Sequence, residues 1–224
     1  MRSYESGVRD ALALIDQLAL VRAGDRVLDV GCGPGAMVPG LLERAGSGGS
    51  YVGFDVHGPS IAWCRRRYAE DRRCRFVLAR IASPYSTSDG GPIEQYSFPV
   101  ADRRADFILA KSVFTHLMPS EAGRYLSEIQ RTLQPGRPAV LTAFLFASGS
   151  RTGSGWSRFF RSTDSTGKVR WRSPLRPSSA VAYERDYFFA LVERAGLRVQ
   201  WLSAGFFPGD SDSLSGQDVL ILGH

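Results

Sequence analysis

Three glycines and an aspartate are the residues whose types and spacing point most directly to chemistry. The glycines occupy alternate positions of the sequence Gly31-Cys32-Gly33-Pro34-Gly35. Glycine allows a tight turn and lets a ligand approach the backbone without meeting a Cβ atom. Asp55 follows Gly35 by 20 residues, and a carboxylate at that place can accept hydrogen bonds from both hydroxyls of a ribose. The spacing therefore indicates nucleoside binding, an arrangement that dinucleotide enzymes share.

Alternating strands and helices must position this loop and its acid. Apolar runs predict seven strands, at Arg26–Val30, Tyr51–Val56, Arg75–Ile81, Ala105–Ser112, Ala139–Phe146, Leu197–Leu202 and Gln217–Leu222. Apolar residues at helical spacing predict helices over Val8–Ala19, Met37–Ala45, Gly58–Glu70, Ala122–Leu133 and Tyr183–Ala195. Ser120 is expected to cap the fourth of these helices, and Gly196 is expected to follow the end of the fifth.

The order of these elements predicts the fold class. Alternation of strand and helix implies an α/β fold of three layers, Rossmann-like, in which helices cover both faces of a mostly parallel sheet of seven strands. No helix fits between the last two strands, so the last strand is expected to run antiparallel. Residues 1–224 are expected to form a single domain. Ligands of such sheets bind beyond the carboxyl ends of the strands, where the glycine loop and Asp55 lie.

Several stretches match the motifs of one known enzyme family. Val27–Gly35 matches its first motif at every position, and Tyr51–Val56 looks like its second. Ala105–Leu109 with Ser112–Leu117 looks like the fourth strand and following loop of its small-molecule subgroup, and Leu126–Gly136 resembles the helix and turn before its fifth strand. On these stretches the chain resembles the class I S-adenosylmethionine-dependent methyltransferases, over most of residues 8–147 and more loosely over 181–224.

The resemblance implies S-adenosylmethionine as the cofactor and gives roles to single residues. Gly31 and Gly33 would pass close to its methionine part, and Asp29 would meet its amino group, directly or through water. Asp55 would hold the ribose hydroxyls, and Val56 would lie against adenine. The rest of the implied cofactor-binding set is Cys32, Gly35, Arg80, Ile81, Ser112 and Val113.

The end of the third strand departs from the family pattern. The family often has an aspartate there for the adenine amino group, but Arg80 stands at this place, and arginine cannot accept a hydrogen bond. Two alternatives remain for adenine. The backbone of Arg80 and Ile81 holds it, or a residue of the following loop such as Ser83 does.

His116 is the candidate catalytic residue. Methyl transfer from a sulfonium is an in-line displacement, so the protein mainly supplies alignment, and a base is needed only where the acceptor must lose a proton. His116 lies just past the fourth strand, and an imidazole pKa of about 6.5 suits that task. The alternative is that His116 only packs or bonds backbone. His57 is expected beside the ribose or in solvent, and His224 is expected to be inert.

Absent motifs narrow the reaction. Lys111-Ser112-Val113-Phe114 lacks the Asp/Asn-Pro-Pro-aromatic signature of many nucleic-acid and glutamine N-methyltransferases, and it has no Pro-Cys pair for cytosine chemistry. It also lacks an acid for the magnesium of catechol-type enzymes, and its lysine opposes a cation. Metal-independent methylation, most often of oxygen, is what remains, and no metal site is expected.

Two insertions, 83–99 and 148–180, are expected to form a cap over the substrate. The first carries Tyr85, Tyr96 and Phe98, and the second carries Trp156, Phe159, Phe160 and Trp171, although ordinary packing is the alternative for each ring. The chain has 28 basic and 22 acidic residues, and the whole +6 excess falls in 148–180, which holds Arg151, Arg158, Arg161, Lys168, Arg170, Arg172 and Arg176 against Asp164. This charge favours an acidic acceptor such as a carboxylated or phosphorylated sugar or natural product.

Other functions stay open at this stage. Gly31, Gly33 and Ala36 also fit a nicotinamide dehydrogenase, the basic segment could serve an RNA methyltransferase, and the fold could bind the cofactor without catalysis. The neutral remainder of the chain argues against nucleic acid as a partner. No apolar run approaches the ~18 residues that cross a bilayer, and charges interrupt the N-terminal apolar stretch. Three cysteines, an odd number without metal-ligand spacing, favour the reducing cytoplasm.

Overall fold

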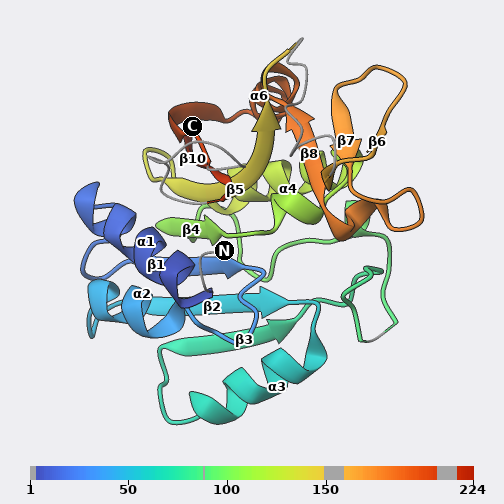
Figure 1. The fold of residues 1–224 in the computed structure, drawn as a ribbon. Helices are drawn as coiled ribbons and strands as arrows, with labels where there is room; N and C mark the ends of the chain where they lie inside the picture. Colours follow the sequence, from blue (N-terminus) through green and yellow to red (C-terminus); the bar gives the residue numbers. More distant parts are fainter. Residues whose placement is uncertain (1–3, 88, 149–158, 206–215) are drawn as a thin grey trace. The chain divides into compact units, whose positions relative to one another are not determined.

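A computed structural model describes residues 4–87, 89–148, 159–205 and 216–224 (Figure 1). These residues form two compact units. The first lies within Met1–Ala110 and Arg131–Ala139, and the second within Lys111–Gln130 and Val140–His224. No helix among the described residues is long and apolar enough to span a membrane.

The first unit contains four parallel strands in the order β3-β2-β1-β4. They are β1 (Arg26–Val30), β2 (Ser50–Asp55), β3 (Cys74–Leu78) and β4 (Phe107–Ala110). Figure 1 shows β1, β2 and β3 side by side with their arrowheads on the same side. Because the strands are parallel, the loops that follow β1 and β2 leave the sheet at one edge, and Gly31 and Asp55 therefore come together there.

Three helices belong to this unit: α1 (Tyr4–Gln17), α2 (Val38–Ala45) and α3 (Gly58–Arg67). Helix α2 packs on β1 and β2, and α3 packs on β2 and β3. The apolar spacing of α2 explains its burial, since Val38, Leu41, Leu42 and Ala45 share one buried face. Each such fully buried Leu or Val stabilises the fold by about 1.5–3 kcal/mol.

The segment between β3 and β4 covers the sheet without a long helix. Among its described residues the only helical turn is η1 (Ile93–Gln95). Phe98, 3% exposed, lies with its ring 4.8 Å from that of Phe54 on β2, and the Tyr96 ring lies 5.7 Å from Phe54. These two aromatic residues thus pack against the sheet, which is the alternative to lining an acceptor pocket, while Tyr85 is exposed.

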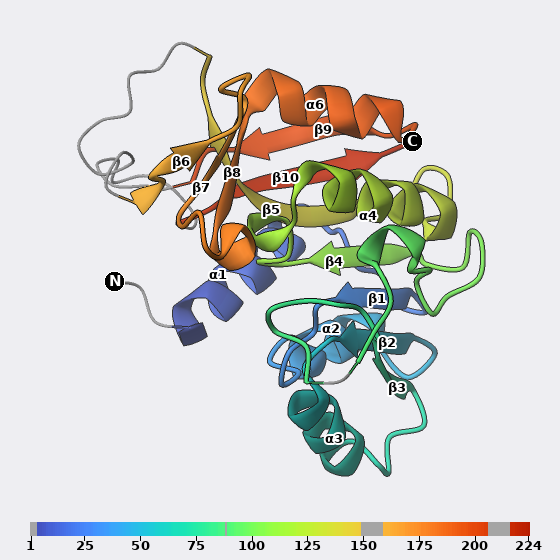
Figure 2. The same cartoon turned by 90° about the vertical axis from the view of Figure 1, so that its right-hand side faces the viewer.

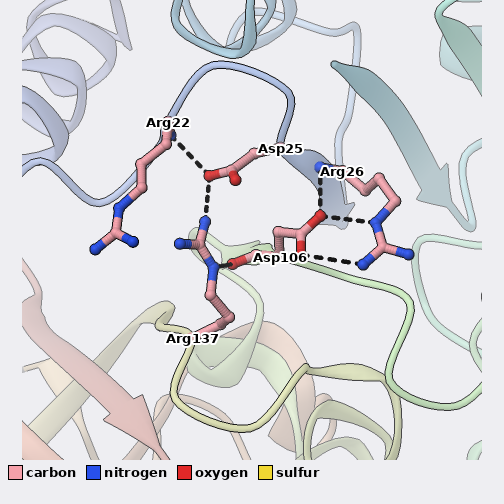
Figure 3. Close-up of polar contacts among 5 residues, drawn as sticks. All are labelled: Arg22, Asp25, Arg26, Asp106 and Arg137. Carbon is pink, nitrogen blue, oxygen red and sulfur yellow. Dashed lines mark hydrogen bonds and ion pairs between the residues drawn. The ribbon is translucent and has the colours of Figure 1, made fainter. Parts of the chain in front are cut away.

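A network of ion pairs links the chain segments at the amino ends of β1 and β4 (Figure 3). The Arg26 guanidinium donates to both Asp106 carboxylate oxygens, at 2.7 and 3.0 Å. Arg137 donates to Asp25 and, at 2.8 Å, to the Asp106 carbonyl, and the Arg22 amide donates to Asp25 at 2.7 Å. Burial raises the pKa of Asp106, but the hydrogen bonds and charge of Arg26 outweigh it and hold the pKa below its usual value.

The second unit is built around β5 (Ala139–Phe146), from Val140 onward, with β9 (Arg198–Ser203) and β10 (Asp218–Gly223). Strand β10 pairs with both β5 and β9, and it runs antiparallel to β9, as the sequence predicted. Helix α4 (Pro119–Thr132) belongs to this unit up to Gln130, and α6 (Arg185–Arg194) packs on β9 (Figure 2).

Three short strands of this unit were not predicted. They are β6 (Ser162–Thr163), β7 (Val169–Trp171) and β8 (Val181–Glu184), which form an antiparallel set beside the end of β5. Strand β8 runs parallel to β5, with Ala182 opposite Phe144. The predicted helix over Tyr183–Ala195 was therefore wrong at its start, because Tyr183 lies in β8, where its hydroxyl donates to the Leu117 carbonyl.

Helix ends show one success and one error. Gly196 follows α6 with a φ of 80°, which is the left-handed conformation that glycine adopts after a helix. Ser120 is not the cap of α4, because the helix already begins at Pro119, whose fixed φ suits a first turn. The Glu121 carboxylate instead accepts the Met118 amide. The predicted fold class is confirmed: parallel strands dominate, and the C-terminal pair is antiparallel.

Candidate active site

The glycine loop follows β1 and turns through three left-handed residues. The φ values of Gly31, Gly33 and Gly35 are 68°, 51° and 77°. The amides of Gly31 and Cys32 both donate to the Phe54 carbonyl, at 2.9 and 3.1 Å, which ties the loop to β2. A Cβ atom on Gly35 would lie 3.0 Å from the Cys64 Sγ, whereas a Cβ on Gly33 would meet nothing within 4 Å. Gly35 therefore serves packing, and Gly33 borders open space.

Asp55 ends β2 and contacts the same loop. Its Oδ2 accepts the Gly33 amide at 2.8 Å, and its Oδ1 accepts the His57 amide at 2.8 Å. Each carboxylate oxygen can accept a further donor, so both remain able to receive a ligand hydroxyl. Val56, half-buried, follows at once. The structure therefore brings Asp55 to Gly33, the pair that the sequence spacing predicted.

Asp29, the last residue but one of β1, is 3% exposed. Its Oδ2 accepts the Tyr51 hydroxyl at 2.6 Å, and Tyr51 is fully buried on β2. Burial first, and then the charge of Asp29, raise the pKa of Tyr51 well above its usual value, so this tyrosine stays a neutral donor. Sequence analysis missed Tyr51, although an aromatic hydroxyl in an apolar strand beside an acid-bearing strand is a signal that could have found it.

Two cysteines flank the glycine loop. The Sγ atoms of Cys32 and Cys64 lie 3.7 and 3.6 Å from the Gly33 carbonyl oxygen. Burial raises the pKa of the Cys64 thiol to about 11, and it also raises that of Cys32. Both groups are therefore neutral thiols that pack beside the loop.

The end of β3 continues into a segment that bonds to Gly91. The Ile81 amide donates to the Ala79 carbonyl at 3.1 Å, and the Arg80 carbonyl accepts the Gly91 amide at 3.3 Å. The Arg80 side chain is exposed, and Ile81 is fully buried. Ser83, the other candidate for adenine, accepts the Tyr85 amide with its hydroxyl at 3.2 Å.

In the second unit, Ser112 holds an unusual backbone conformation. Its φ of 58° is in the left-handed region, which a residue with a Cβ adopts only when its surroundings enforce it. Its amide donates to the Thr142 Oγ1 at 2.7 Å, and its hydroxyl donates to the Gln217 Oε1 at 3.1 Å. Thr142 also bonds Gln217. Sequence analysis missed both partners, although Thr142 is a polar residue in the otherwise apolar strand Ala139–Phe146.

His116 follows Ser112 and Val113 in the turn η2 (Phe114–His116). Its amide donates to the Val113 carbonyl at 2.9 Å, and its Nδ1 lies 3.0 Å from the Ser178 carbonyl oxygen. A carbonyl can only accept, so Nδ1 carries the proton in this contact. Burial lowers the pKa of His116, and hydrogen bonds to the backbone of Ser178 and Ser179 oppose this only in part. His116 is thus neutral at pH 7.

Two arginines of the basic insertion stack on aromatic rings. Within the described part, the Arg170 guanidinium carbon lies 4.1 Å from the centre of the Phe146 ring, and that of Arg172 lies 5.0 Å from the Phe159 ring. Phe160 is buried with its ring 5.4 Å from Phe144. The predicted residues Arg151, Trp156 and Arg158 lie outside the described residues. Among the residues that are described, no group of three or more His, Cys, Asp or Glu could hold a metal ion.

The sequence of this chain was compared with known protein families and proteins. Residues 27–136, which include β1, the glycine loop and Asp55, match the methyltransferase domain family. A curated relative of this chain is an uncharacterized 37.1 kDa protein in a transposon of Streptomyces fradiae, 25% identical over 156 residues. The match covers 62% of this chain and 41% of that protein, so the chain spans less than half of its relative.

Solved structures of methyltransferases share the fold of this chain. A SAM-dependent methyltransferase from Aquifex aeolicus is 17% identical with a TM-score of 0.60, over 94% of this chain and 88% of that one. The 1,6-didemethyltoxoflavin-N1-methyltransferase of Burkholderia thailandensis is 19% identical with a TM-score of 0.62, over 98% and 78%. The O-methyltransferase NcsB1 of neocarzinostatin biosynthesis is 17% identical with a TM-score of 0.58, over 95% and 52%.

These likenesses confirm the class I methyltransferase fold. The structures from Burkholderia thailandensis and from neocarzinostatin biosynthesis hold S-adenosylhomocysteine, which is what S-adenosylmethionine becomes when its methyl group leaves. S-adenosylmethionine is the cofactor of the family, as the sequence predicted.

Proposed function

We propose that this chain transfers a methyl group from S-adenosylmethionine to an oxygen of a small acidic molecule, without a metal ion. The observation that carries the proposal is the contact between the Asp55 carboxylate and the Gly33 amide, at the edge where β1 and β2 end. The open space at the Cβ position of Gly33 fits a ligand that passes close to the backbone.

The cofactor supplies an activated methyl group when it is bound. The residues of the chain therefore have three tasks, which are to bind the cofactor, to orient the acceptor and to accept its proton. Asp55 would hold the ribose hydroxyls, and Asp29 the ammonium group. Gly31, Cys32, Gly33 and Gly35 form the loop around the methionine part, Val56, Arg80 and Ile81 face adenine, and Ser112 and Val113 complete the set. His116 would take the proton of the acceptor hydroxyl on Nε2, since its Nδ1 already carries one at the Ser178 carbonyl.

The acidic acceptor is supported by the charge of the insertion and by a relative. The second unit keeps Arg161, Lys168, Arg170 and Arg172 in one stretch, and arginine meets a carboxylate through two parallel hydrogen bonds. The O-methyltransferase from neocarzinostatin biosynthesis was crystallised with 1,4-dihydroxy-2-naphthoic acid, an aromatic acid with hydroxyl groups. We propose that the two insertions, 83–99 and 148–180, cover such an acceptor within one methyltransferase domain. The three cysteines are free thiols, which suits a reducing compartment.

Calorimetry with S-adenosylmethionine tests the cofactor site. Asp55→Ala should weaken binding by about 1.5–3 kcal/mol, which is the usual range for hydrogen bonds to a charged group. Glu43→Ala is the matched control, because Glu43 is an exposed acid on α2 of the same unit. Equal affinities for wild type and Asp55→Ala would place the cofactor elsewhere.

A panel of hydroxylated aromatic acids and their uncharged amides tests the acceptor. Release of S-adenosylhomocysteine should be faster with the acids, and chelation by EDTA should leave the rate unchanged. Arg170→Gln together with Arg172→Gln should raise the KM of an acid and leave the KM of its amide unchanged. A preference for the amides, or a rate that EDTA abolishes, would contradict the proposal.

His116→Gln should lower kcat by about 100-fold with little change in cofactor affinity. Burial lowers the pKa of His116 below the ordinary histidine value of about 6.5. The wild-type rate should therefore be constant above about pH 6.5 and should fall only at lower pH. A variant that keeps the full rate would leave His116 a packing residue.

A further inference from the structure

Asp29 is held by a tyrosine that neither the family motif nor the proposed reaction requires. Strand β2 pairs with β1 so that Gly53 lies opposite Asp29, and Tyr51 precedes Gly53 by two residues. Side chains two residues apart in a strand lie on the same face of a sheet. Tyr51, Gly53 and Asp29 therefore share one face, and the tyrosine hydroxyl reaches Asp29 across the glycine.

The glycine makes this reach possible. A Cβ atom on Gly53 would lie 2.8 Å from the Tyr51 Cε1 and 2.9 Å from the Cys32 Sγ. Real Cβ atoms do not approach other heavy atoms so closely, and both neighbours are buried. The missing side chain at position 53 is thus the space through which the Tyr51 ring passes to place its oxygen 2.6 Å from the Asp29 Oδ2.

The ring itself has little freedom to move away. Its centre lies 5.6 Å from that of Phe76 on β3, and the Phe76 ring in turn lies 5.6 Å from the ring of Tyr68. Tyr51 is fully buried, so a change of rotamer would require neighbouring strands to separate. The hydroxyl position is therefore fixed by the sheet.

The chemistry of the donor matters as much as its position. A buried carboxylate needs hydrogen-bond donors, because burying an unsatisfied charge is costly. An arginine would satisfy Asp29 but would also cancel its charge. A tyrosine hydroxyl satisfies one oxygen and leaves the negative charge in place, which is what the attraction of a ligand ammonium requires.

We propose that Tyr51 is a positioning residue, whose hydroxyl orients the Asp29 carboxylate toward the ammonium group of the cofactor, with Gly53 providing the space. This inference rests on the proposed function of the glycine loop and Asp29. It predicts that the Tyr51 hydroxyl contributes to binding only through the amino-acid part of the ligand.

Two ligands that differ in this part separate the possibilities. S-adenosylhomocysteine carries the ammonium group, and 5′-methylthioadenosine has the same nucleoside without the amino-acid part. Calorimetry on Tyr51→Phe should show about 10-fold weaker binding of S-adenosylhomocysteine, as for loss of one hydrogen bond to a charged group, and unchanged binding of 5′-methylthioadenosine. A role in packing alone would weaken both ligands equally or neither.

Three further variants complete the test. Tyr68→Phe is the matched control, because this ring packs on the same Phe76, and both affinities should stay at wild-type values. In an Asp29→Asn background, Tyr51→Phe should have a much smaller effect, since the hydroxyl acts through the carboxylate. Gly53→Ala would crowd both the Tyr51 ring and Cys32 of the glycine loop, so it should weaken S-adenosylhomocysteine at least as much as Tyr51→Phe does.

The outcomes distinguish this inference from the proposed function. If neither ligand bound the wild-type protein, the proposed cofactor site would be wrong. If wild type preferred S-adenosylhomocysteine and Tyr51→Phe kept that preference, the site would stand and the role of Tyr51 would be overturned. Equal weakening of both ligands by Tyr51→Phe would overturn it as well.

Discussion

Two aspartates lie near each end of strand β1, and the groups that bond to their carboxylates differ between the two ends. At the amino end, Asp106 and Asp25 bond to the guanidinium groups of Arg26 and Arg137 (Figure 3). At the carboxyl end, Asp55 accepts two backbone amides, and Asp29 accepts the hydroxyl of Tyr51. The amino-end donors carry a positive charge, whereas these carboxyl-end donors are neutral.

This difference in donor charge indicates that, within the first unit, the amino-end aspartates stabilise the fold and the carboxyl-end aspartates bind a ligand. A guanidinium pair cancels the charge of an acid and fixes its geometry, which suits a permanent junction between chain segments. A neutral donor fixes the geometry alone and keeps the negative charge for a ligand. The comparison predicts that damage at the amino end lowers stability, whereas damage at the carboxyl end lowers ligand affinity.

The largest effect is expected from blocking the open space at Gly33. Gly33→Val should reduce S-adenosylmethionine affinity by more than about 100-fold, while the left-handed backbone costs about 1–2 kcal/mol of stability. Gly136→Val is the matched control, because Gly136 also has a positive φ and open space at its Cβ position, near the amino end. It should lose similar stability and keep its affinity. Calorimetry and denaturant unfolding measure both, and a Gly136 variant that binds no cofactor would break the comparison.

The next effect is on folding. Arg137→Met should lower the free energy of unfolding by about 3 kcal/mol, because it leaves the largely buried Asp25 carboxylate without its cation. Cofactor affinity should be unchanged. Urea titration checks the stability, with Arg66→Met on the exposed side of α3 as control. A stable variant that had lost affinity would show that the two ends are not independent.

The smallest effect is a dependence of stability on pH. The pKa of Asp106 is lower in the folded protein than in the unfolded chain, where it is about 3.9. The unfolded state therefore binds more protons near that pH, so the contribution is complete above about pH 5 and is lost as pH falls through the folded pKa. Asp106→Asn should flatten the stability profile as the pH falls below about 5. An unchanged profile would mean that the Arg26 pair does not shift this acid.

Local patterns in the sequence were enough to predict the frame of the site. The strands Arg26–Val30 and Ala139–Phe146 are found with the predicted bounds, because an apolar run between turn residues needs no distant partner to be recognised. The glycine loop adopts its three left-handed residues for the same local reason. The approach of Gly33 to Asp55 then followed from the rule that parallel strands end at one edge.

Features that depend on distant pairing could not be predicted in this way. Strand β8 exists because Val181–Glu184 meets the end of β5, and the same residues continue into the apolar pattern of α6, which led to a prediction of helix. Gln217 reaches Thr142 over 75 residues, and Arg26 reaches Asp106 over 80. Neither pair has a spacing that a sequence pattern records, so only the folded backbone brings these partners together.

The discontinuous course of the first unit has a consequence for how the protein is made. Its strands are all synthesised once Ala110 has been added, but Arg131–Ala139 belongs to the same unit and carries the cation of Asp25. Translation at ~5–20 residues per second reaches Ala139 about 1.5 to 6 s later. During that interval the nascent strands carry Asp25 without the guanidinium of Arg137. The ion pair between Asp25 and Arg137 at the amino end of the sheet can therefore form only after residues 111–130 of the second unit have been synthesised.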